Sequence, residues 1–465
     1  MVRTHHQQPT LWTGFLKEEV SDLWEPWMRQ ADQLLEDEQL VEQIYEAQRR
    51  RCKKSRTRGR LQTPSEIVLR LLILKHVRNW SYQTLEREVR ANLVYRSFAR
   101  IGGEKVPDAK TLGRLGQVVG PEVVAGLHRR IVELAVEKKV VQGRRMRIDT
   151  TVVETNIHYP TDSSLLSDGA RVLTRLMKSI AGTVSGLKER VRDRMRSVRK
   201  QAVGVAIAAR RKGEAGVEQR RGLYKKLLSL SRKIVNQAGR VAQEVAALPR
   251  KTQAQVSGLV RQMEVMRERT RQVIRQAKAR IFDGDTKHPD KLTSVFEPHT
   301  EIIRKGKASK PTEFGKMAKV QEAENQIVTH VEVFDQRPAD SDVLVDAVAK
   351  HLAVCGRTPD LVAADAGFYS QANEKALEEQ GVKRVSIPSR NTKSAARKKQ
   401  QKQRWFKNGQ RWRTGCEGRI SVLKRRHGLE RCLYPGLEGI KRWVGMGVIA
   451  DNLINIGRQL AVAAG

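Results

Sequence analysis

Two short apolar runs, each ending in an aspartate, limit how this chain can fold. Asp149 follows the run 146–148, and Asp365 follows the run 361–364. Runs of this kind predict buried strands, and a carboxylate at the edge of a buried sheet is costly unless it is paired or bound to a metal. With residues 161–285 set aside, the order of predicted elements is strand, strand, strand, helix, strand, helix, strand, helix. We therefore expect an α/β fold with a mixed sheet and helices on both faces.

A third carboxylate stands at the start of a basic helix. Glu417 is followed at helical spacing by Ser421 and Lys424, so these three side chains share one face. We expect Lys424 to reach a phosphate group and nearby arginines to line the path of a nucleic-acid strand. The helix can equally be an amphipathic one with Ile420 and Leu423 packed inward, and both interpretations can hold because a helix has two faces. The predicted DNA-contacting arginines are Arg413, Arg419, Arg425 and Arg426.

The charge balance indicates the kind of partner. The 465 residues include 89 lysines and arginines against 51 aspartates and glutamates, a net charge of +38. This surplus predicts binding to a phosphate polymer that weakens steeply with salt, although charge alone does not distinguish DNA from RNA. Three carboxylates from three elements suit two Mg²⁺ ions, with Mn²⁺ as a substitute, acting on DNA phosphodiesters. The predicted catalytic and metal-binding residues are Asp149, Asp365 and Glu417.

Other features of the composition exclude several classes of protein. The four cysteines form no CxxC pair, so neither a zinc site nor a disulfide framework is expected. No apolar run approaches the roughly 18 residues of a membrane span, and the first residues lack the apolar core of a signal peptide. We therefore expect a soluble, cytoplasmic, nucleoid-associated protein with no membrane partner.

The N-terminal part of the chain predicts helices. Residues 1–60 predict a helical arm with a basic linker, and residues 61–120 predict a compact helical domain. The string 63–66 has the pattern of a capping box with proline at the first helical position, and Ser81 and Asp108 are expected to cap two further helices. Such a domain resembles a helix-turn-helix DNA-binding module, the alternative being a bundle that binds nothing. The basic residues expected on its surface are Arg70, Lys75, Arg78, Arg87, Arg90 and Arg96.

A basic helical insertion at 161–285 interrupts the predicted catalytic domain, residues 121–465. Residues 161–280 hold 29 lysines and arginines against nine acidic residues, which is over half of the chain's positive surplus. Apolar residues recur there at helical spacing, which predicts a long helical hairpin or a small bundle. The insertion is interpreted as a platform for DNA or a contact for a second protomer, the alternative being a solvated insert. A second basic stretch, 389–404, is predicted to be a loop.

Three longer strings resemble conserved blocks of a known family. They are DTTVVETNIHYPTDSSLL (149–166), ADAGFYS (364–370) and the segment 417–453, which opens EGRISVLKRRHGLERC. In this order, and behind the helical segment 66–114, they resemble the DDE transposases of bacterial insertion sequences, within the insertion-sequence-four and -five superfamily. The resemblance implies an RNase H-like catalytic core and the same triad of acids.

The resemblance also implies an activity. A member of this family binds the terminal inverted repeats of its element, pairs them in a homodimer, cleaves the strands and joins the ends to target DNA. Its tyrosine-arginine-glutamate-lysine signature is matched by Arg413, Glu417 and Lys424, but Gln410 stands at the tyrosine position. The insertion lies between the first two strands instead of before the last helix, so the DNA contacts of family insertions are not carried over. The alternatives are a non-catalytic DNA-binding protein derived from a transposase and an RNA-associated basic protein.

Overall fold

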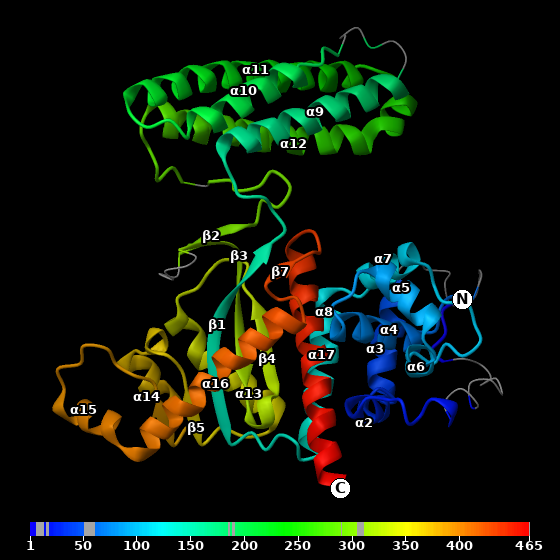
Figure 1. Cartoon of the computed structure of the whole chain (residues 1–465), viewed down its shortest axis with the longest axis vertical. Helices are drawn as coiled ribbons and strands as arrows, with labels where there is room; N and C mark the ends of the chain where they lie inside the picture. Colours follow the sequence, from blue (N-terminus) through cyan, green and yellow to red (C-terminus); the bar gives the residue numbers. More distant parts are fainter. Residues whose placement is uncertain are drawn as a thin grey trace. The chain divides into compact units, whose positions relative to one another are not determined.

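The computed structural model describes residues 1–5, 14, 18–50, 61–184, 187, 191–289, 291–304 and 311–464 (Figure 1). The chain divides into two compact units, one of Met1–Asn156 with Gly315–Gly465 and one of Ile157–Phe314. Residues 51–60 of the predicted basic linker lie outside the described residues, and so do residues 6–13 and 15–17 of the predicted arm. No helix within the described ranges is long and apolar enough to cross a membrane.

The first unit is built on a mixed sheet. In it β1 lies between β3, to which it is antiparallel, and β5, to which it is parallel. The sheet continues from β5 to the parallel β6, while β4 pairs antiparallel with β3 and β7 pairs with the end of β1. The α/β class predicted from the sequence is confirmed. The strands are β1 (Arg145–Thr155), β3 (Thr312–Glu322), β4 (Val328–Val333), β5 (Leu361–Ala363), β6 (Arg384–Ser386) and β7 (Arg431–Cys432).

The helices of this unit fall into an N-terminal and a C-terminal group. The N-terminal helices are α2 (Pro26–Leu34), α3 (Glu38–Arg50), α4 (Ser65–Val77), α5 (Tyr82–Ala91), α6 (Leu93–Phe98), α7 (Ala109–Val118) and α8 (Pro121–Glu137). The C-terminal α-helices are α13 (Leu344–Cys355), α14 (Gln371–Glu379), α15 (Ala395–Lys402), α16 (Arg404–Arg426) and α17 (Leu437–Ala464). Three short 3₁₀ helices join these elements: η1 (Glu324–Gln326), η2 (Asp340–Val343) and η3 (Ala366–Phe368).

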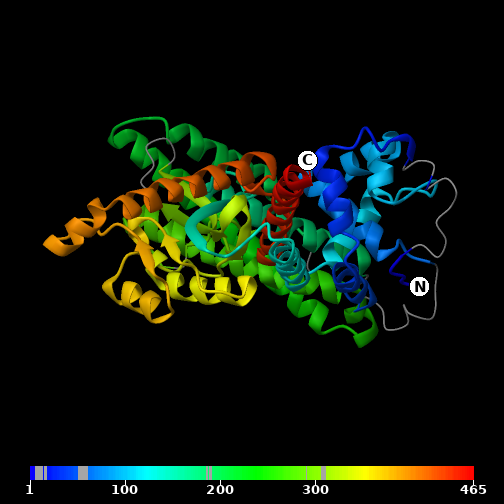
Figure 2. The same ribbon diagram turned by 90° about the horizontal axis from the view of Figure 1, so that it is seen from below.

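Helices cover both faces of the sheet, as Figure 2 shows with α16 on one side of the strands and α13 and α14 on the other. Met146 and Ile148 of β1 pack on the side of α13 and α14, whereas Val153 packs on the side of α16 and α17. Because side chains alternate between the two faces of a strand, Arg147 and Asp149 share the face of Val153. The first predicted carboxylate is therefore on the face that α16 covers.

The basic stretch 389–404 is partly helical, so the prediction of a loop was wrong for residues 395–402. Ser394 caps α15 by accepting a hydrogen bond from the backbone N–H of Arg397 at 3.3 Å. The Arg397 side chain is buried and donates to the Ile387 carbonyl oxygen at 2.7 Å and to the Glu374 carboxylate. The hydrogen bonds of the buried Arg397 side chain thus fix a segment whose composition is typical of a solvated loop.

The N-terminal helices share one apolar core with α17, and α4 is buried on all sides from Ser65 to His76. Ser81 and Asp108 cap α5 and α7 as predicted. The predicted capping box at 63–66 was wrong, because α4 begins after Pro64 with no side-chain cap. The Ser65 hydroxyl instead donates to the Gln48 side chain at 2.6 Å.

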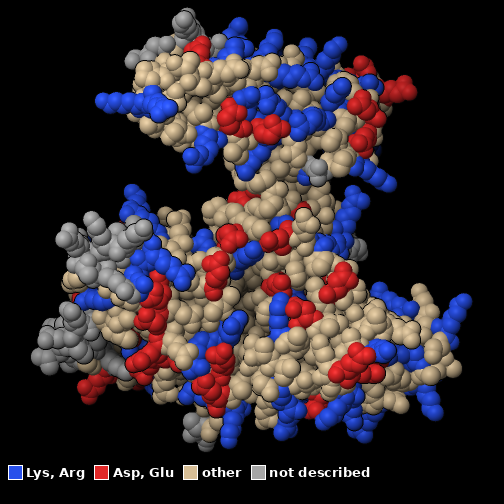
Figure 3. All heavy atoms as spheres, turned by 180° about the vertical axis from the view of Figure 1, so that it is seen from behind, with Lys and Arg blue, Asp and Glu red and all other residues tan. Residues whose placement is uncertain are grey.

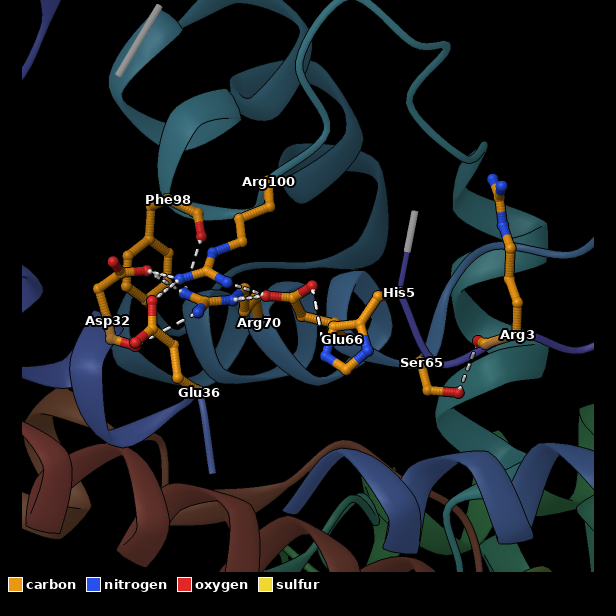
Figure 4. A network of polar contacts seen from close by, with 9 residues as sticks. All are labelled: Arg3, His5, Asp32, Glu36, Ser65, Glu66, Arg70, Phe98 and Arg100. Carbon is orange, nitrogen blue, oxygen red and sulfur yellow. Dashed lines mark hydrogen bonds and ion pairs between the residues drawn. The ribbon is translucent and has the colours of Figure 1, made fainter. Parts of the chain in front are cut away.

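Arg70 and Lys75 were wrongly predicted to be exposed, because α4 passes through the middle of this core. The Arg70 guanidinium donates to the Asp32 carboxylate at 2.6 Å, to Glu66 at 3.3 Å and to the Phe98 carbonyl oxygen at 3.2 Å (Figure 4). Arg100 contacts the same two acids from the other side. The buried charges are therefore paired and hydrogen-bonded, which is the condition for charge in a protein interior.

The second unit contains a bundle of four helices, as the helical spacing of its apolar residues predicts. Their apolar residues form one core, and on the face that Figure 3 shows many lysines and arginines lie at the surface with fewer acidic residues among them. Gly213 precedes the third helix with a positive φ of 85°, and Pro249 precedes the fourth. The elements are α9 (Asp162–Thr183), α10 (Met195–Ala208), α11 (Glu214–Ala246), α12 (Arg250–Phe282) and strand β2 (Glu301–Arg304).

Candidate active site

Asp149 lies within β1, where it pairs with Val320 of β3, and Asp365 follows the end of the adjacent strand β5. The parallel register of β1 and β5 pairs Arg147 with Ala363, so its continuation by two residues sets Asp149 level with Asp365. Backbone groups orient both carboxylates: Asp149 Oδ1 accepts from its neighbour's N–H at 2.7 Å, and Asp365 Oδ1 accepts from the Gly367 N–H at 2.8 Å. Both side chains are partly accessible. The fold thus brings together two acids that are 216 positions apart in the sequence.

Arg413 connects Asp149 with the third predicted acid. It precedes Glu417 by one helical turn of α16 and donates from Nη2 to Glu417 Oε1 at 2.9 Å, while its Nη1 lies 4.0 Å from Asp149 Oδ2. The Arg413 side chain is 14% exposed and the Glu417 side chain is 59% exposed. A positive group therefore lies between two of the three acids, and the outermost acid is free to rotate toward solvent.

The set of donors at this site is made of carboxylate oxygens, which suits a hard divalent cation such as Mg²⁺. Within the described part of the chain, however, no three acidic, histidine or cysteine side chains converge closely enough to hold a metal ion. The ion pair with Arg413 holds Glu417 against its own helix.

A fourth carboxylate, Asp340, lies near Asp365 and was not predicted. Its Oδ1 accepts a hydrogen bond from the hydroxyl of Thr150, the residue after Asp149, at 3.0 Å. A Cβ atom placed on Gly367 would lie 3.2 Å from Asp340 Oδ2 and 3.1 Å from Asp365 Oδ1, so both oxygens crowd one glycine. The sequence gives no signal for this role, since Asp340 stands where a helix begins and resembles a cap there.

Helix α16 is held on the sheet by a buried arginine. Arg147 of β1 donates from Nε to Glu322 Oε2 at 2.9 Å, and its guanidinium lies 4.9 Å from the centre of the Trp412 ring. Glu322 is fully buried, and burial raises the pKa of its carboxyl although Arg147 opposes the shift. Gly415 makes the close approach possible, because a Cβ atom there would lie 2.2 Å from Arg147 Nη1.

Replacing Gly415 by alanine is therefore expected to destabilise the first unit by about 1–3 kcal/mol, since Arg147 cannot move without losing its buried partners. Gly418→Ala on the same helix is the matched control, because a Cβ atom there meets nothing within 4 Å. That variant should be neutral or more stable by up to about 1 kcal/mol. Thermal unfolding followed by tryptophan fluorescence measures both. Equal midpoints for the two variants would show that the contact with Arg147 does not fix α16.

Gln410, at the position of the signature tyrosine, connects α16 to two strands. Its Nε2 donates to the Ala364 carbonyl oxygen at 3.2 Å and to the Ser386 carbonyl oxygen at 2.5 Å. Ala364 immediately precedes Asp365, so this contact sets the helix that carries Glu417 against the strand end that carries the second aspartate. Gln410 is thus a positioning residue in this chain.

The predicted DNA-contacting cations differ in accessibility. Arg425 and Arg426 are exposed at the end of α16, and Lys424 is half-buried. The prediction that Arg419 contacts DNA was wrong. Its side chain is 6% exposed, and its Nη1 donates to both oxygens of Asp451 at 2.8 Å. Its guanidinium is occupied inside the protein, so it is not available to a DNA strand. Arg413 contacts the acids of the candidate site instead of solvent.

Two family models match the chain. One, described as a transposase domain (DUF772), matches residues 25–117, and the other, described as a transposase DDE domain, matches residues 295–453. The second match contains Asp365 and Glu417, whereas β1 with Asp149 lies outside both. The search of curated proteins and the search of solved structures found no match. The family matches confirm the recognition from sequence motifs: this is a DDE transposase of insertion sequences.

Proposed function

We propose that this transposase binds the ends of its element, cleaves DNA strands and transfers them to target DNA. The observation that carries the proposal is the placement of three sequence-distant acids around β1: Asp149 in β1, Asp365 just after the adjacent β5, and Glu417 joined to Asp149 through Arg413. Both aspartates are partly accessible, as ligands of a metal ion must be. The mixed strand order supports an RNase H-like core.

The three acids are the residues that would hold two Mg²⁺ ions, with Mn²⁺ as a substitute. Such ions activate the attacking water or hydroxyl and stabilise the leaving oxygen of a phosphodiester. The chain's own residues keep the acids in place: backbone N–H groups orient the aspartates, and Gln410 and Arg147 fix α16. Arg413 neutralises part of the carboxylate repulsion until the site is occupied, and then is positioned to meet a phosphate oxygen.

Metal-dependent nicking tests this function against the alternative of a non-catalytic DNA-binding protein. Duplex DNA ending in the inverted repeats that flank the gene is incubated with the protein in Mg²⁺, in Mn²⁺ and in a chelator. We expect nicks at the repeat ends with either metal and intact DNA with the chelator. Binding without nicks under all three conditions would support the non-catalytic alternative, and equal binding to RNA would support an RNA-associated protein.

We also propose roles for the remaining parts. Residues 61–120 bind duplex DNA, the predicted arm 1–60 assists them, and two protomers pair the element ends as a homodimer in the cytoplasm of a bacterial cell. The helical insertion, predicted at 161–285, contributes a basic surface. Four cations of α11 and α12 line one groove of the bundle with a single acid, Glu218, among them: Arg221, Lys225, Arg232 and Lys278.

Changing these four groove cations to glutamine is expected to weaken DNA binding and to reduce the slope of log affinity against log salt by about three to four, because each phosphate contact contributes about 0.9. Lys178→Gln with Arg271→Gln is the control from the same unit, since these cations already pair with Asp193 at 2.6 Å and Glu268 at 3.3 Å. Fluorescence anisotropy over a salt series measures the slopes. An unchanged slope in the fourfold variant would assign the groove to another role.

A further inference from the structure

A second pocket of the first unit lies apart from the candidate active site, where α4 ends and α5 and α17 begin. Its volume is about 370 Å³, within the range of small-ligand sites, roughly 300–1,000 Å³. The described residues that line it include two cations, Lys75 and Arg442, and no acidic side chain. We name it the Lys75 pocket. Its positive charge favours the binding of an anion.

Lys75 is a buried cation with no carboxylate partner among the described residues. Its side chain is 2% exposed, and its Nζ lies 4.9–5.1 Å from the ring centres of Tyr82, Tyr434 and Trp443. Burial lowers the pKa of its ammonium to about 8, and Cys432 opposes this shift only in part. Contacts with aromatic faces offset only part of the cost of burying a charge. An anion that binds in the pocket would offset the remaining cost of burying this charge.

The N-terminus of α5 adds hydrogen-bond donors to the same pocket. Ser81 caps this helix by accepting from the Thr84 N–H at 3.0 Å, and the next two residues, Tyr82 and Gln83, also line the pocket. The backbone N–H groups of a first helical turn have no partner within the helix and favour an anion. The partial charge of the helix end therefore acts together with Lys75 and Arg442.

Part of the pocket lining is apolar and aromatic, which a bare phosphate ion would not use. Trp80 and Pro435 belong to this part, and Leu433 is 60% exposed there. Two residues with amide side chains, Asn79 and Gln117, also line the pocket. A flat heteroaromatic ring with hydrogen-bonding edges suits such a surface, because bases stack on aromatic side chains and pair with amides at their edges.

We propose that the Lys75 pocket binds one nucleotide of a DNA strand, with its phosphate at Lys75, Arg442 and the start of α5 and its base against the wall of Trp80, Leu433 and Pro435. The choice of DNA as the source rests on the proposed function; the chemistry of a nucleotide rests on the pocket alone. The pocket thereby gives the helical domain and α17 a joint role in holding a strand.

Calorimetric titration with a deoxynucleoside 5′-monophosphate, in a chelator, tests the proposal on the full chain. Lys75→Met and Arg442→Gln should each weaken binding about tenfold or more, the loss expected for a charge-assisted contact. Arg87→Gln, an exposed cation of α5 outside the pocket, should bind like the wild type. Lys75→Met should melt at the same or a higher temperature, because it removes a buried charge that no carboxylate balances. A lower melting point with unchanged nucleotide binding would assign Lys75 a purely structural role and overturn the proposal.

Three further binding measurements distinguish a nucleotide of DNA from other ligands. Inorganic phosphate and the nucleoside without phosphate should each bind more weakly than the nucleotide, and equal binding of phosphate would overturn the role of the base. A single-stranded hexanucleotide should displace the mononucleotide, and failure to displace it would overturn DNA as the source. Glu417→Gln should retain nucleotide binding, so a failure of the cleavage account and a failure of this pocket give different results.

Discussion

Glu417→Gln is expected to lower the rate of DNA strand cleavage by about 10³-fold or more while DNA binding stays within about twofold of the wild type. In the proposed role, loss of one metal-binding charge would remove several kcal/mol of transition-state stabilisation, which corresponds to at least three decades in rate. The side chain is 59% exposed and its ion pair with Arg413 lies at the surface. Folding should therefore change little, since exposed ion pairs contribute roughly 0–1 kcal/mol. Single-turnover cleavage of end-labelled DNA and a gel-shift titration give the two quantities.

Glu438→Gln is the matched control for this experiment. Glu438 is 62% exposed and pairs with Lys441 at 3.3 Å on α17, so the change has the same chemistry and a similar surface environment. It should cleave at the wild-type rate. If both variants lose activity together, the loss comes from surface charge in general and the role assigned to Glu417 is wrong.

Arg70→Met is expected to have the largest effect on stability, about 3–5 kcal/mol, because it leaves buried carboxylates without their main partner. Arg70 is 0% exposed, and Asp32 and Glu66 beside it are 6% and 4% exposed. Burial lowers the pKa of Arg70 even with both acids in contact, which shows how little solvent reaches the group. Arg100 still contacts both acids, but its side chain is 26% exposed and replaces only part of the loss.

Tryptophan fluorescence isolates this effect, because all seven tryptophans lie outside the unit Ile157–Phe314. Trp24 and Trp27 pack edge-on against Phe98, whose carbonyl oxygen Arg70 binds. Denaturant unfolding of Arg70→Met is compared with Arg87→Met, an exposed arginine paired only with its neighbour Glu88. The control should stay within about 0.5 kcal/mol of the wild type. A loss below about 1 kcal/mol for Arg70→Met would mean that the network does not stabilise the core.

The features that sequence patterns predicted are those encoded locally. The apolar runs before Asp149 and Asp365 indicate buried strands without knowledge of their neighbours, and β1 and β5 are found there. The helical spacing of 161–280 likewise needs no tertiary information, and four helices occupy that segment. The placement of Glu417 on a long basic helix follows from the same periodicity.

The features that were missed depend on contacts between distant segments. Arg70 and Lys75 have the charges of surface residues, and only the packing of α2, α5 and α17 around α4 shows that they are buried. Asp340 reaches the site through Thr150, which is 190 positions away. Arg419 is committed to Asp451, 32 positions further along the chain. Periodicity predicts which face of a helix is apolar, but it does not predict which acid a given arginine will find.

The role of Asp149 as a metal ligand is the central claim, and a metal-rescue experiment on Asp149→Cys tests it most directly. Thiolate is a poor ligand for Mg²⁺ and a better one for softer divalent ions. We predict that Asp149→Cys fails to cleave DNA in Mg²⁺ and regains cleavage in Mn²⁺, whereas Asp149→Ala stays inactive in both. Cleavage by Asp149→Ala in Mg²⁺ at the wild-type rate would contradict the account.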